Sequence, residues 1–505
     1  MADWTGPIWY ANKSVANLSH LRLDPASDVP LYKQLAESIR TLVERGAMSS
    51  GERLPATREL AGRLGLNRAT VSSAYAMLEQ SGLIEGHVGR GSFIARHSTP
   101  VSNRRVDWES ILPPVTPFVR SAHGITISFA NSRPSEDAFP LTQFRRLSKQ
   151  VVDSPEAAGI LQLGSPHGYP PLRRFLLDQA AGQGIARAGD DLIVTNGCQQ
   201  ALDLIARLFV HDQATVILED PVYHGLLRVF TRTRAKIVPI SVDAAGMNVE
   251  VLREAMEQHR PRVLVVTPSF QNPTGVTLPL ERRKRIVELA QRFGTVLVES
   301  DIYSDLRYRG KPLPSLKELD ESGQTILLRS YSKISFPGLR VGWVIAPQPV
   351  VARLADAKQL SDLHSDQLSQ AILLRFAESG ELDRHLDRTR RAGVERLNAV
   401  IEACGRCLPS GTKYTRPEGG MNLWIELPAP LTAGKLLGAV QERGVDFLPG
   451  SYFTEGRTHE RGLRISFGGL SPEQITAGIR ILGEAATELI ADAGPANLEA
   501  RAALV

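Results

Sequence analysis

The chain has 505 residues, too many for one ordinary hydrophobic core, so two or three domains are expected. A hydrophobic share of 42% and a charged share of 22% are typical of a globular protein, and a net charge of +5 is compatible with nucleic-acid binding without establishing it. The sequence contains no apolar run of about 18 residues, so no transmembrane helix is predicted. The first residues lack a signal-peptide pattern, so we expect a cytoplasmic protein with no membrane contact.

The three cysteines predict no metal site. Cys404 and Cys407 form a single Cys-x-x-Cys pair, without a second pair or a histidine cluster to complete a zinc site. We therefore expect reduced thiols and no bound metal.

Residues 28–96 show the pattern of a winged helix-turn-helix domain. Apolar residues recur at helical spacing at Leu31, Leu35, Ile39 and Leu42. This spacing predicts an amphipathic helix that ends at Gly46. Pro55 stands where a proline begins a helix, and Thr57 to Leu64 continue it.

The next elements complete this domain. Gly65 ends the second helix, and Asn67 caps a third helix that runs to about Gln80. Two short helices about a glycine turn form a helix-turn-helix, whose second helix can lie in the major groove of DNA. The segment LIEGHVGRGSFI is apolar, then turn-forming, then apolar, which predicts a two-stranded wing with Arg90 at its tip between two glycines.

Polar side chains of this domain are candidates for DNA contacts. Arg58, near the start of the second helix, suits a phosphate. Asn67, Arg68 and Thr70 begin the recognition helix, where the base edges lie. Arg90 can enter a minor groove or meet a phosphate. The alternative is a winged helix used only for protein contacts, with these arginines merely solvated.

The stretch from PLYKQLAESIR through GERLPATRELAGRLGLNRATVSSAY to LEQSGLIEGHVGRGSFI resembles the winged helix of the GntR family. This resemblance implies that the protein binds operator DNA. It also implies DNA contacts for Arg58, Arg68, Thr70 and Arg90.

Residues 97–124 are predicted to form a linker. Its prolines are Pro100, Pro113, Pro114 and Pro117, and no helical or strand period is sustained across them. Such a segment is semi-stiff. It separates the winged helix from a larger unit over residues 125–490.

The larger unit alternates short β-branched apolar runs with longer helical patterns. The runs are DLIVTNG, ATVILED, RVLVVTPS, GTVLVESD and GQTILLRS. Continuous apolar strands at these intervals predict an α/β fold, with a parallel sheet covered by helices on both faces. Beyond about Ser361 the chain becomes helical and ends in a smaller α+β part, with strands near MNLWIEL and GLRISFGG.

The sharpest local feature of this unit is SYSKISFPGLR, which directly follows the strand TILLR. A lysine on a loop at a strand end, such as Lys333, can form a Schiff base. Ser330 and Arg340 flank it with a hydroxyl and a fork-shaped cation that can hold a dianionic phosphate. Taken alone, this segment is also compatible with a surface loop that contains a lysine.

Further polar groups follow earlier strands. In TNGCQQALDLIARLF a glycine turn precedes a helix, so the backbone N–H groups of Gly197, Cys198 and Gln199 are expected to form an anion nest, although a plain strand-to-helix turn is the alternative. In EDPVYHG the ring of Tyr223 can stack on a planar cofactor, or it is an ordinary tyrosine at the rim of a cleft.

Two later strands add to this set. Asn272 stands before a proline in PSFQNPTG, which is otherwise a simple Asn-Pro turn. In ESDIYSD, Asp301 can hold a pyridine nitrogen protonated and Tyr303 can hydrogen-bond a phenolic oxygen. All these groups fall at the carboxyl ends of successive strands, where ligands collect in open parallel sheets.

This ordered set, together with GSPHGYPPLRRFL, resembles the fold-type I aminotransferases over roughly residues 125–490. The resemblance implies pyridoxal 5′-phosphate as cofactor, bound covalently to Lys333. Its other implied ligands are Tyr223 against the ring, Asn272 and Tyr303 at the phenolic oxygen, and Gly197, Cys198, Ser330 and Arg340 at the phosphate. Arg464 in GLRISFGG corresponds to the arginine that binds a substrate α-carboxylate, and its alternative is a surface arginine.

This chain departs from the family pattern at two positions. Leu163 stands where many relatives have a tyrosine that donates to the phosphate of the neighbouring subunit, and leucine cannot donate. The pyridine-binding aspartate usually lies where this chain has Ser300. Asp301 is the available carboxylate, but a shift of one residue along a strand turns the side chain to the other face.

The order of winged helix, linker and aminotransferase-like domain resembles the MocR/GabR subfamily of GntR-type regulators. The resemblance implies a head-to-tail homodimer that senses a small amino compound or pyridoxal phosphate itself and changes its hold on DNA. A working transaminase of the aminoadipate or kynurenine type, with an accessory winged helix, is the alternative. A third hypothesis is a protein-binding scaffold that has lost the cofactor.

Overall fold

The computed structural model describes Leu18 and residues 21–87, 91–95, 106–112, 124–456 and 458–492. The chain divides into two compact units, Met1–Phe118 and Val119–Val505, and each contains its own hydrophobic core. No helix of the described ranges is long and apolar enough to cross a membrane.

The first unit contains the three helices and the wing that its sequence pattern predicts. In chain order its elements are α1 (Leu31–Glu44), α2 (Thr57–Leu64), α3 (Arg68–Gln80), β1 (Ile84–His87) and β2 (Gly91–Ile94). Gly65 ends α2 in the left-handed conformation, at φ 65°. The side chain of Asn67 accepts a hydrogen bond from the backbone N–H of Ala69 at 2.9 Å and so caps α3. Strands β1 and β2 pair in antiparallel fashion.

The core of this unit extends beyond its helices. Leu35, Ile39 and Val71 are fully buried, and so is Leu18, which precedes the first helix. The side chain of Gln34 on α1 binds the intervening segment, since its Nε2 donates to the carbonyl oxygens of Asp24 (3.0 Å) and Val29 (2.6 Å). The sequence before Leu31 carried no prediction, and the structure shows that part of it packs on the winged helix.

The described part of the predicted linker contains a single helical turn, α4 (Trp108–Ile111). Asp107 caps it, with its side chain accepting from the N–H of Ser110 at 3.4 Å. Trp108 and Ile111 are exposed, at 62% and 61%. This turn is too short to be stable by itself.

The second unit is built on a large mixed sheet. Its strands are β4 (Asp190–Thr195), β5 (Thr215–Asp220), β6 (Lys236–Asp243), β7 (Gly246–Met247), β8 (Val263–Val266), β9 (Val296–Ser300), β10 (Ile326–Ser330) and β11 (Gly342–Pro347). They lie in the order β4-β11-β10-β9-β8-β5-β6-β7. The predicted apolar runs form β4, β5, β8, β9 and β10.

The predicted parallel sheet is mixed, because two of its strands are antiparallel to their neighbours. Strand β11 is antiparallel to both β10 and β4, and β7 is antiparallel to β6. A parallel connection needs a long crossover, usually a helix. Residues 331–341 between β10 and β11 form only short 3₁₀ turns, at Tyr331–Lys333 and Pro337–Leu339, so the chain returns beside β10 in the opposite direction.

Helices cover both faces of this sheet, as predicted, because alternate strand residues point to opposite sides. On β10, Leu328 packs with residues of α8 (Cys198–Phe209) and α13 (Gln348–Asp362). Its neighbour Leu327 packs with α7 (Pro170–Gly182) and α14 (Gln367–Glu378). The remaining helices of the sheet layers are α5 (Leu141–Val152), α6 (Ala157–Ile160), α9 (His224–Thr231), α10 (Val249–His259), α11 (Leu280–Phe293) and α12 (Leu316–Leu319).

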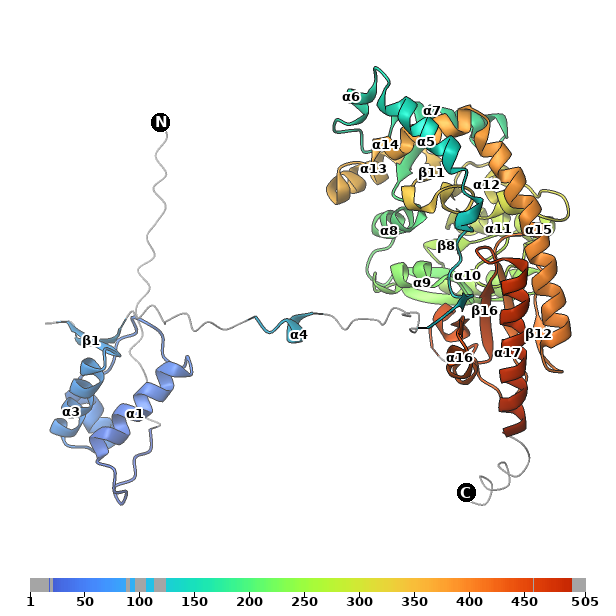
Figure 1. Cartoon of the computed structure of the whole chain (residues 1–505). Coiled ribbons are helices and arrows are strands. Elements are labelled where there is room, and N and C mark those ends of the chain that lie inside the picture. The colour runs from blue at the N-terminus through green and yellow to red at the C-terminus, as the bar shows by residue number, and fades with distance from the viewer. Residues whose placement is uncertain are drawn as a thin grey trace, which may run out of the picture. The chain divides into compact units, whose positions relative to one another are not determined.

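A smaller α+β part completes the second unit. Its sheet has the order β12-β13-β16-β15, with β12 (Lys413–Tyr414), β13 (Asn422–Glu426), β15 (Leu448–Pro449) and β16 (Gly462–Ser466). Beside it, β3 (Ile127–Ser128) pairs with β14 (Val445–Asp446). Its helices are α15 (Glu381–Cys407), α16 (Ala433–Gln441) and α17 (Pro472–Asp492), of which α15 and α17 lie side by side (Figure 1). The predicted strands near MNLWIEL and GLRISFGG are β13 and β16.

Candidate functional site

Lys333 lies in the 3₁₀ turn that directly follows β10, at the carboxyl edge of the large sheet. Its side chain is half-buried, and its Nζ donates a hydrogen bond to the backbone carbonyl of Ser132. The Ser132 hydroxyl lies 3.5 Å from the hydroxyl of Tyr303. The lysine therefore points toward a polar group of residues that come from distant parts of the chain.

Ser330 and Arg340 border the same turn. The Ser330 side chain is buried and accepts from the N–H of Ser332 at 3.0 Å. Arg340 is exposed, and its Nη2 donates to the carbonyl of Asn196 at 3.1 Å, just before α8. A hydroxyl, a guanidinium and the start of a helix thus meet at one place, which is the chemistry that a phosphate requires.

The expected anion nest at α8 needs one correction. The N–H of Gly197 donates to the carbonyl of Thr195 at 2.8 Å and is not available to a ligand. The turn at Gly197, with φ 78°, brings these two groups together. The N–H groups of Cys198 and Gln199 have no acceptor within the described ranges. Gly197 contributes through its missing side chain, because a Cβ there would collide with the guanidinium of Arg340.

Cys198 presents its backbone rather than its thiol. Burial raises the pKa of the thiol to about 12, and Sγ donates to the carbonyl of Arg329 at 3.3 Å. A thiol so far from ionisation is neither a nucleophile nor a phosphate ligand. The side chain of Gln199 is also used internally, since its Nε2 donates to the carbonyl of Gly225 at 3.0 Å.

Tyr223 stands at the start of α9, on the turn that follows β5. Its ring is half-buried, and burial raises the pKa of its hydroxyl. The phenol of Tyr303 and the cations Arg464 and Arg340 lie close enough to influence that pKa as well. This ring therefore borders the same polar group as Lys333.

A chain of hydrogen bonds joins Asn272, Tyr303 and Arg464. Asn272 donates from Nδ2 to the hydroxyl of Tyr303 at 3.4 Å, and its Oδ1 accepts from Nη1 of Arg464 at 3.2 Å. Both distances are long for such bonds. The tyrosine and the asparagine are buried, so little solvent competes for these groups.

Asp301 lies just beyond the end of β9 and is buried. Its Oδ2 accepts from Ser304 Oγ at 2.9 Å and from Nε of Arg329 at 3.0 Å. Its Oδ1 is buried without a hydrogen-bond partner in the described part of the chain. A carboxylate held on one oxygen with the other oxygen free is prepared to accept one more N–H.

Arg464 is only 2% exposed, so the interpretation of a surface arginine is wrong. Besides Asn272 it donates to the backbone carbonyl of Ala130, and its guanidinium lies 5.1 Å from the ring centre of Phe453. Its Nε has no partner in the ranges that the structure describes. Burial lowers the pKa of Arg464 to about 10, because desolvation disfavours the cation.

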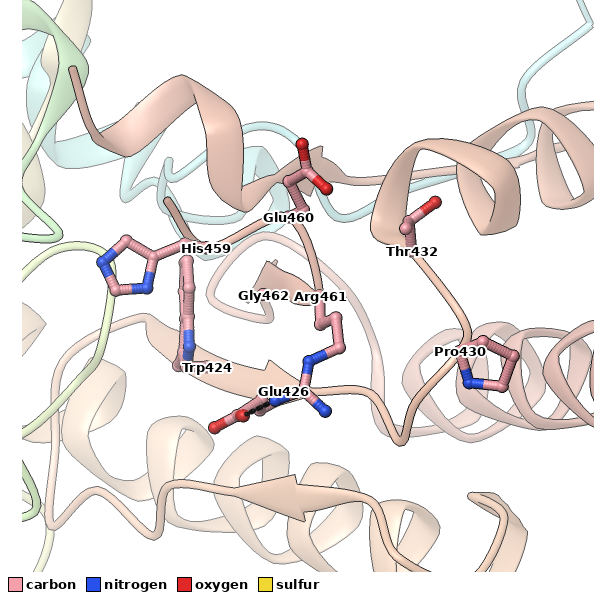
Figure 2. A pocket seen from close by; sticks show the side chains of 8 residues that line it. All are labelled: Trp424, Glu426, Pro430, Thr432, His459, Glu460, Arg461 and Gly462. Atoms are coloured by element: carbon pink, nitrogen blue, oxygen red, sulfur yellow. Dashed lines mark hydrogen bonds and ion pairs between the residues drawn. The ribbon is translucent and has the colours of Figure 1, made fainter. Parts of the chain in front are cut away.

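A pocket of about 410 Å³ lies on the small sheet and is lined in part by Trp424 on β13 and Gly462 on β16. Trp424 stands opposite Arg464 in the register of β13 and β16, so both side chains lie on the same face. Figure 2 shows Trp424 at one side of the pocket and Arg461 extending to Glu426, with which it forms an ion pair at 2.8 Å. At the outer side of the tryptophan, His459 lies 3.2 Å from Asp220 at the end of β5.

The candidate DNA-contacting residues of the winged helix lie at its surface. Arg58, Asn67 and Arg68 are exposed and Thr70 is half-buried. Arg90 lies outside the described residues. Sequence reasoning missed Arg53, which is exposed and whose guanidinium lies against Gly91 at the base of the wing.

Sequence reasoning also missed Ser132 and Ala130, whose carbonyl groups bind Lys333 and Arg464. A backbone carbonyl is present in every residue and leaves no signal in the sequence. Arg329 was also missed, although a charged residue in an apolar strand was a signal for a buried partner.

Two comparisons with known families identify the units. Residues 31–94 match the bacterial regulatory proteins of the gntR family, and residues 130–482 match aminotransferase class I and II. The fold and the site thus define a GntR-type regulator that contains a fold-type I aminotransferase domain.

Individual relatives fall into the same two families. The probable rhizopine catabolism regulatory protein MocR of Rhizobium meliloti is 30% identical, over 92% of this chain and 95% of that protein. Aromatic-amino-acid aminotransferase 1 of Thermococcus litoralis is 35% identical, over 72% of this chain and 88% of that protein. The structure of LysN, an α-aminoadipate aminotransferase from Thermus thermophilus, matches with a TM-score of 0.69 and 35% identity, over 73% of this chain and 94% of that chain. The chain belongs to the MocR-type transcription regulators of the GntR family, which confirms the resemblance seen in the sequence.

Pyridoxal phosphate is the cofactor of this domain, as in the LysN structure, which is complexed with N-(5′-phosphopyridoxyl)-L-leucine. The residues present fit it. The free Oδ1 of Asp301 suits a pyridine N–H, and the unpaired N–H groups of Cys198 and Gln199 beside Arg340 suit a phosphate. The cofactor prediction is therefore confirmed, while the roles of individual residues stay predictions.

Proposed function

We propose that this regulator senses a small amino acid, which binds with its amine at Lys333 and its carboxylate at Arg464. Bound pyridoxal phosphate would supply an electrophilic carbon. The primary amine of an amino acid would bind to this carbon in place of the amine of Lys333. In this proposal Asp301, Asn272 and Tyr303 hold the cofactor ring, and Tyr223 stacks on it. The same protein binds operator DNA through α3 and its flanking residues.

The observation that carries this proposal is the buried, incompletely bonded Arg464. A buried guanidinium loses its hydration, and in the described part of the chain its hydrogen bonds go to the neutral oxygens of Asn272 and Ala130, beside the ring of Phe453. A ligand carboxylate would supply the missing charge and a partner for the free Nε. Hydrogen bonds connect Arg464 through Asn272, Tyr303 and Ser132 to Lys333, so both ends of the proposed effector site border one polar group.

Effector binding would alter DNA binding only as far as the effector prefers one conformation of the regulator. The small α+β part carries Arg464, and it contacts the turn that carries Tyr223. At this contact the carbonyl of Phe453 accepts from the N–H of Val222 at 2.8 Å. Closure of the small sheet over a bound amino acid would act on this contact. We also propose a cytoplasmic head-to-tail homodimer, for which the exposed Leu161 and Leu163 (70% and 74%) offer apolar surface.

The test compares Arg464→Gln with Arg461→Gln, a matched change of an exposed arginine near the same strand. Amino acids are screened by the change that they cause in the visible spectrum of the cofactor. For a hit, Arg464→Gln is expected to weaken affinity by about 2–5 kcal/mol, or roughly 30-fold to several thousand-fold, because it removes a buried charge partner. Arg461→Gln should bind normally. Equal affinity in both variants, for all hits, would reject the carboxylate role.

One observation supports residual transamination as a second activity. Asp301 retains the free, buried oxygen that electron withdrawal by the ring requires, despite its shifted position in the sequence. Steady-state turnover with an amino donor and a 2-oxo acid measures this activity, beside operator binding with and without the donor. Turnover of several per second without any donor effect on DNA affinity would reject the sensor in favour of an enzyme.

A further inference from the structure

Glu219 on β5 is a buried acid that the proposed sensing chemistry does not use. Its side chain is 2% exposed. Its Oε2 accepts from the N–H of Thr267 at 3.2 Å and from Nε2 of Gln271 at 3.4 Å. Its Oε1 is buried without a partner in the described ranges. A carboxyl group in such a place needs a reason, because an apolar residue would cost less to bury.

Its partner Gln271 joins two turns of the site. Nε2 of Gln271 donates to the carbonyl of Pro221 at 2.7 Å, two residues before Tyr223. Its Oε1 accepts from the N–H of Thr274 at 3.0 Å and from the Thr274 hydroxyl at 2.6 Å. One side chain therefore links the turn that carries Tyr223 to the turn that carries Asn272.

The charge state of Glu219 agrees with this arrangement. Burial raises the pKa of Glu219 to about 8, and the hydrogen bonds from Thr267 and Gln271 lower it less than burial raises it. Burial therefore favours the uncharged form of this carboxyl group. A neutral acid can fix an amide by hydrogen bonding without placing a negative charge beside the cofactor.

We propose that Glu219 and Gln271 are positioning residues, a buried clamp that fixes Tyr223 and Asn272 relative to each other against the cofactor. This inference rests on the proposed function, in which those two side chains contact pyridoxal phosphate. Glu219 holds the amide of Gln271, and Gln271 holds both turns. Loss of the clamp loosens Asn272 first, because Asn272 directly follows Gln271 in the chain.

The expected consequence is spectroscopic. The visible absorption of bound pyridoxal phosphate would report the protonation of the Lys333 nitrogen attached to it. A hydrogen-bond donor at the phenolic oxygen would reduce the negative charge that stabilises this protonated nitrogen. A weaker bond from Asn272 therefore raises the midpoint pH of this protonation. A purely structural defect lowers stability and leaves this midpoint where it is.

The experiment titrates the full-length protein with bound pyridoxal phosphate from acid to alkaline pH and follows its visible spectrum. Glu219→Gln keeps a neutral acceptor oxygen, so its midpoint should equal that of the wild type. Glu219→Ala should raise the midpoint by about half a unit and weaken pyridoxal phosphate binding about threefold, as expected for one lost hydrogen bond. If Glu219→Ala does not fold, Gln271→Leu breaks the same clamp.

Asp320→Ala is the matched structural control. Asp320 is also buried. Its partners are Gln291 on α11 and Ser322 and Thr325, which precede β10 at the end of the strand opposite Lys333. This variant should lose stability without any shift of the midpoint.

Asn272→Ala distinguishes the proposed clamp from the proposed cofactor role of Asn272. If it raises the midpoint while Glu219→Ala and Gln271→Leu behave like Asp320→Ala, the clamp is overturned and the cofactor role of Asn272 stands. If Asn272→Ala itself leaves the midpoint unchanged, the proposed cofactor role of Asn272 fails, and the clamp fails with it.

Discussion

Arg58 and Arg68 of the winged helix and Arg464 of the aminotransferase domain stand in opposite surroundings. Arg58 and Arg68 on the winged helix are exposed to solvent. In the aminotransferase domain Arg464 and Arg329 are buried or nearly so, with side chains held by carbonyl and carboxylate oxygens. Arg58, Arg68 and Arg464 are proposed to bind anionic ligands in different dielectric surroundings, whereas Arg329 binds the carboxylate of Asp301.

This difference follows from the two ligands. DNA is a large polyanion, and binding gains from the release of its counterions, so hydrated, mobile cations suffice. An amino acid offers one carboxylate, and a single exposed ion pair contributes little in water. A buried and oriented guanidinium costs stability during folding, but it gives a small ligand strength and selectivity.

The largest expected effect tests whether the two cores are independent. Leu35→Ala empties a fully buried position of the winged-helix core and should cost that unit about 2–5 kcal/mol. Calorimetry should show a lower unfolding temperature for the winged helix. The unfolding temperature of the second unit, followed through cofactor absorption, should not change. Val29→Ala, at a half-exposed position, is the control. A joint shift of both transitions would contradict separate cores.

The next effect concerns the buried acid of the second unit. Because the pKa of Glu219 is raised from 4.5 to about 8, the folded state keeps a proton that the unfolded state loses. Stability should therefore fall as the pH rises from about 4.5 to about 8, by up to about 1.4 kcal/mol per pH unit. Glu219→Gln should lack this loss in urea unfolding of the second unit. If the free energy of unfolding depends on pH in the same way for the wild type and for Glu219→Gln, Glu219 is ionised in the folded protein.

Two arginine variants sharpen the description of the exposed surface. Arg68→Ala should weaken binding to a selected operator by about 1–3 kcal/mol and relax its base preference. Arg58→Ala should weaken binding to all DNA sequences alike. It should also reduce the slope of log affinity against log salt concentration by about one. Arg63→Ala, an exposed arginine paired with Glu59, is the control in fluorescence anisotropy. If Arg58→Ala changes sequence preference instead, its assignment to a phosphate is wrong.

The smallest effect separates capping from DNA contact at Asn67. Asn67→Ala should cost the winged helix about 0.5–2 kcal/mol, because the N–H of Ala69 loses its acceptor. Thermal denaturation of free protein measures this cost, and Asn67→Asp should restore most of it. A loss of operator affinity with unchanged stability would instead make Asn67 a direct base contact.

Local patterns were enough for most secondary structure. The helical spacing from Leu31 to Leu42, the glycine that ends α2 and the cap at Asn67 are each decided within a few residues of the chain. The apolar strands of the large sheet were visible for the same reason. The antiparallel β11 was missed because strand direction depends on how the chain returns, which no local pattern records.

The site was predictable as a set of strand ends but not as a set of contacts. Lys333, Asp301 and Tyr303 were found because polar residues directly after apolar strands are unusual. The occupied N–H of Gly197 was not foreseen, since it depends on turn geometry. Nor was the link between Glu219 and Gln271, which lie far apart along the chain.

Periodic, local patterns of residues are sufficient to show that this chain joins a winged helix to an aminotransferase-like domain. How each charge is used depends instead on contacts across the fold. The tertiary structure buries Arg464 and leaves Arg58 and Arg68 in solvent, although the three residues are chemically the same. The physical reason is that desolvation and partner geometry arise from residues brought together across the fold, and these set the energy of a charge.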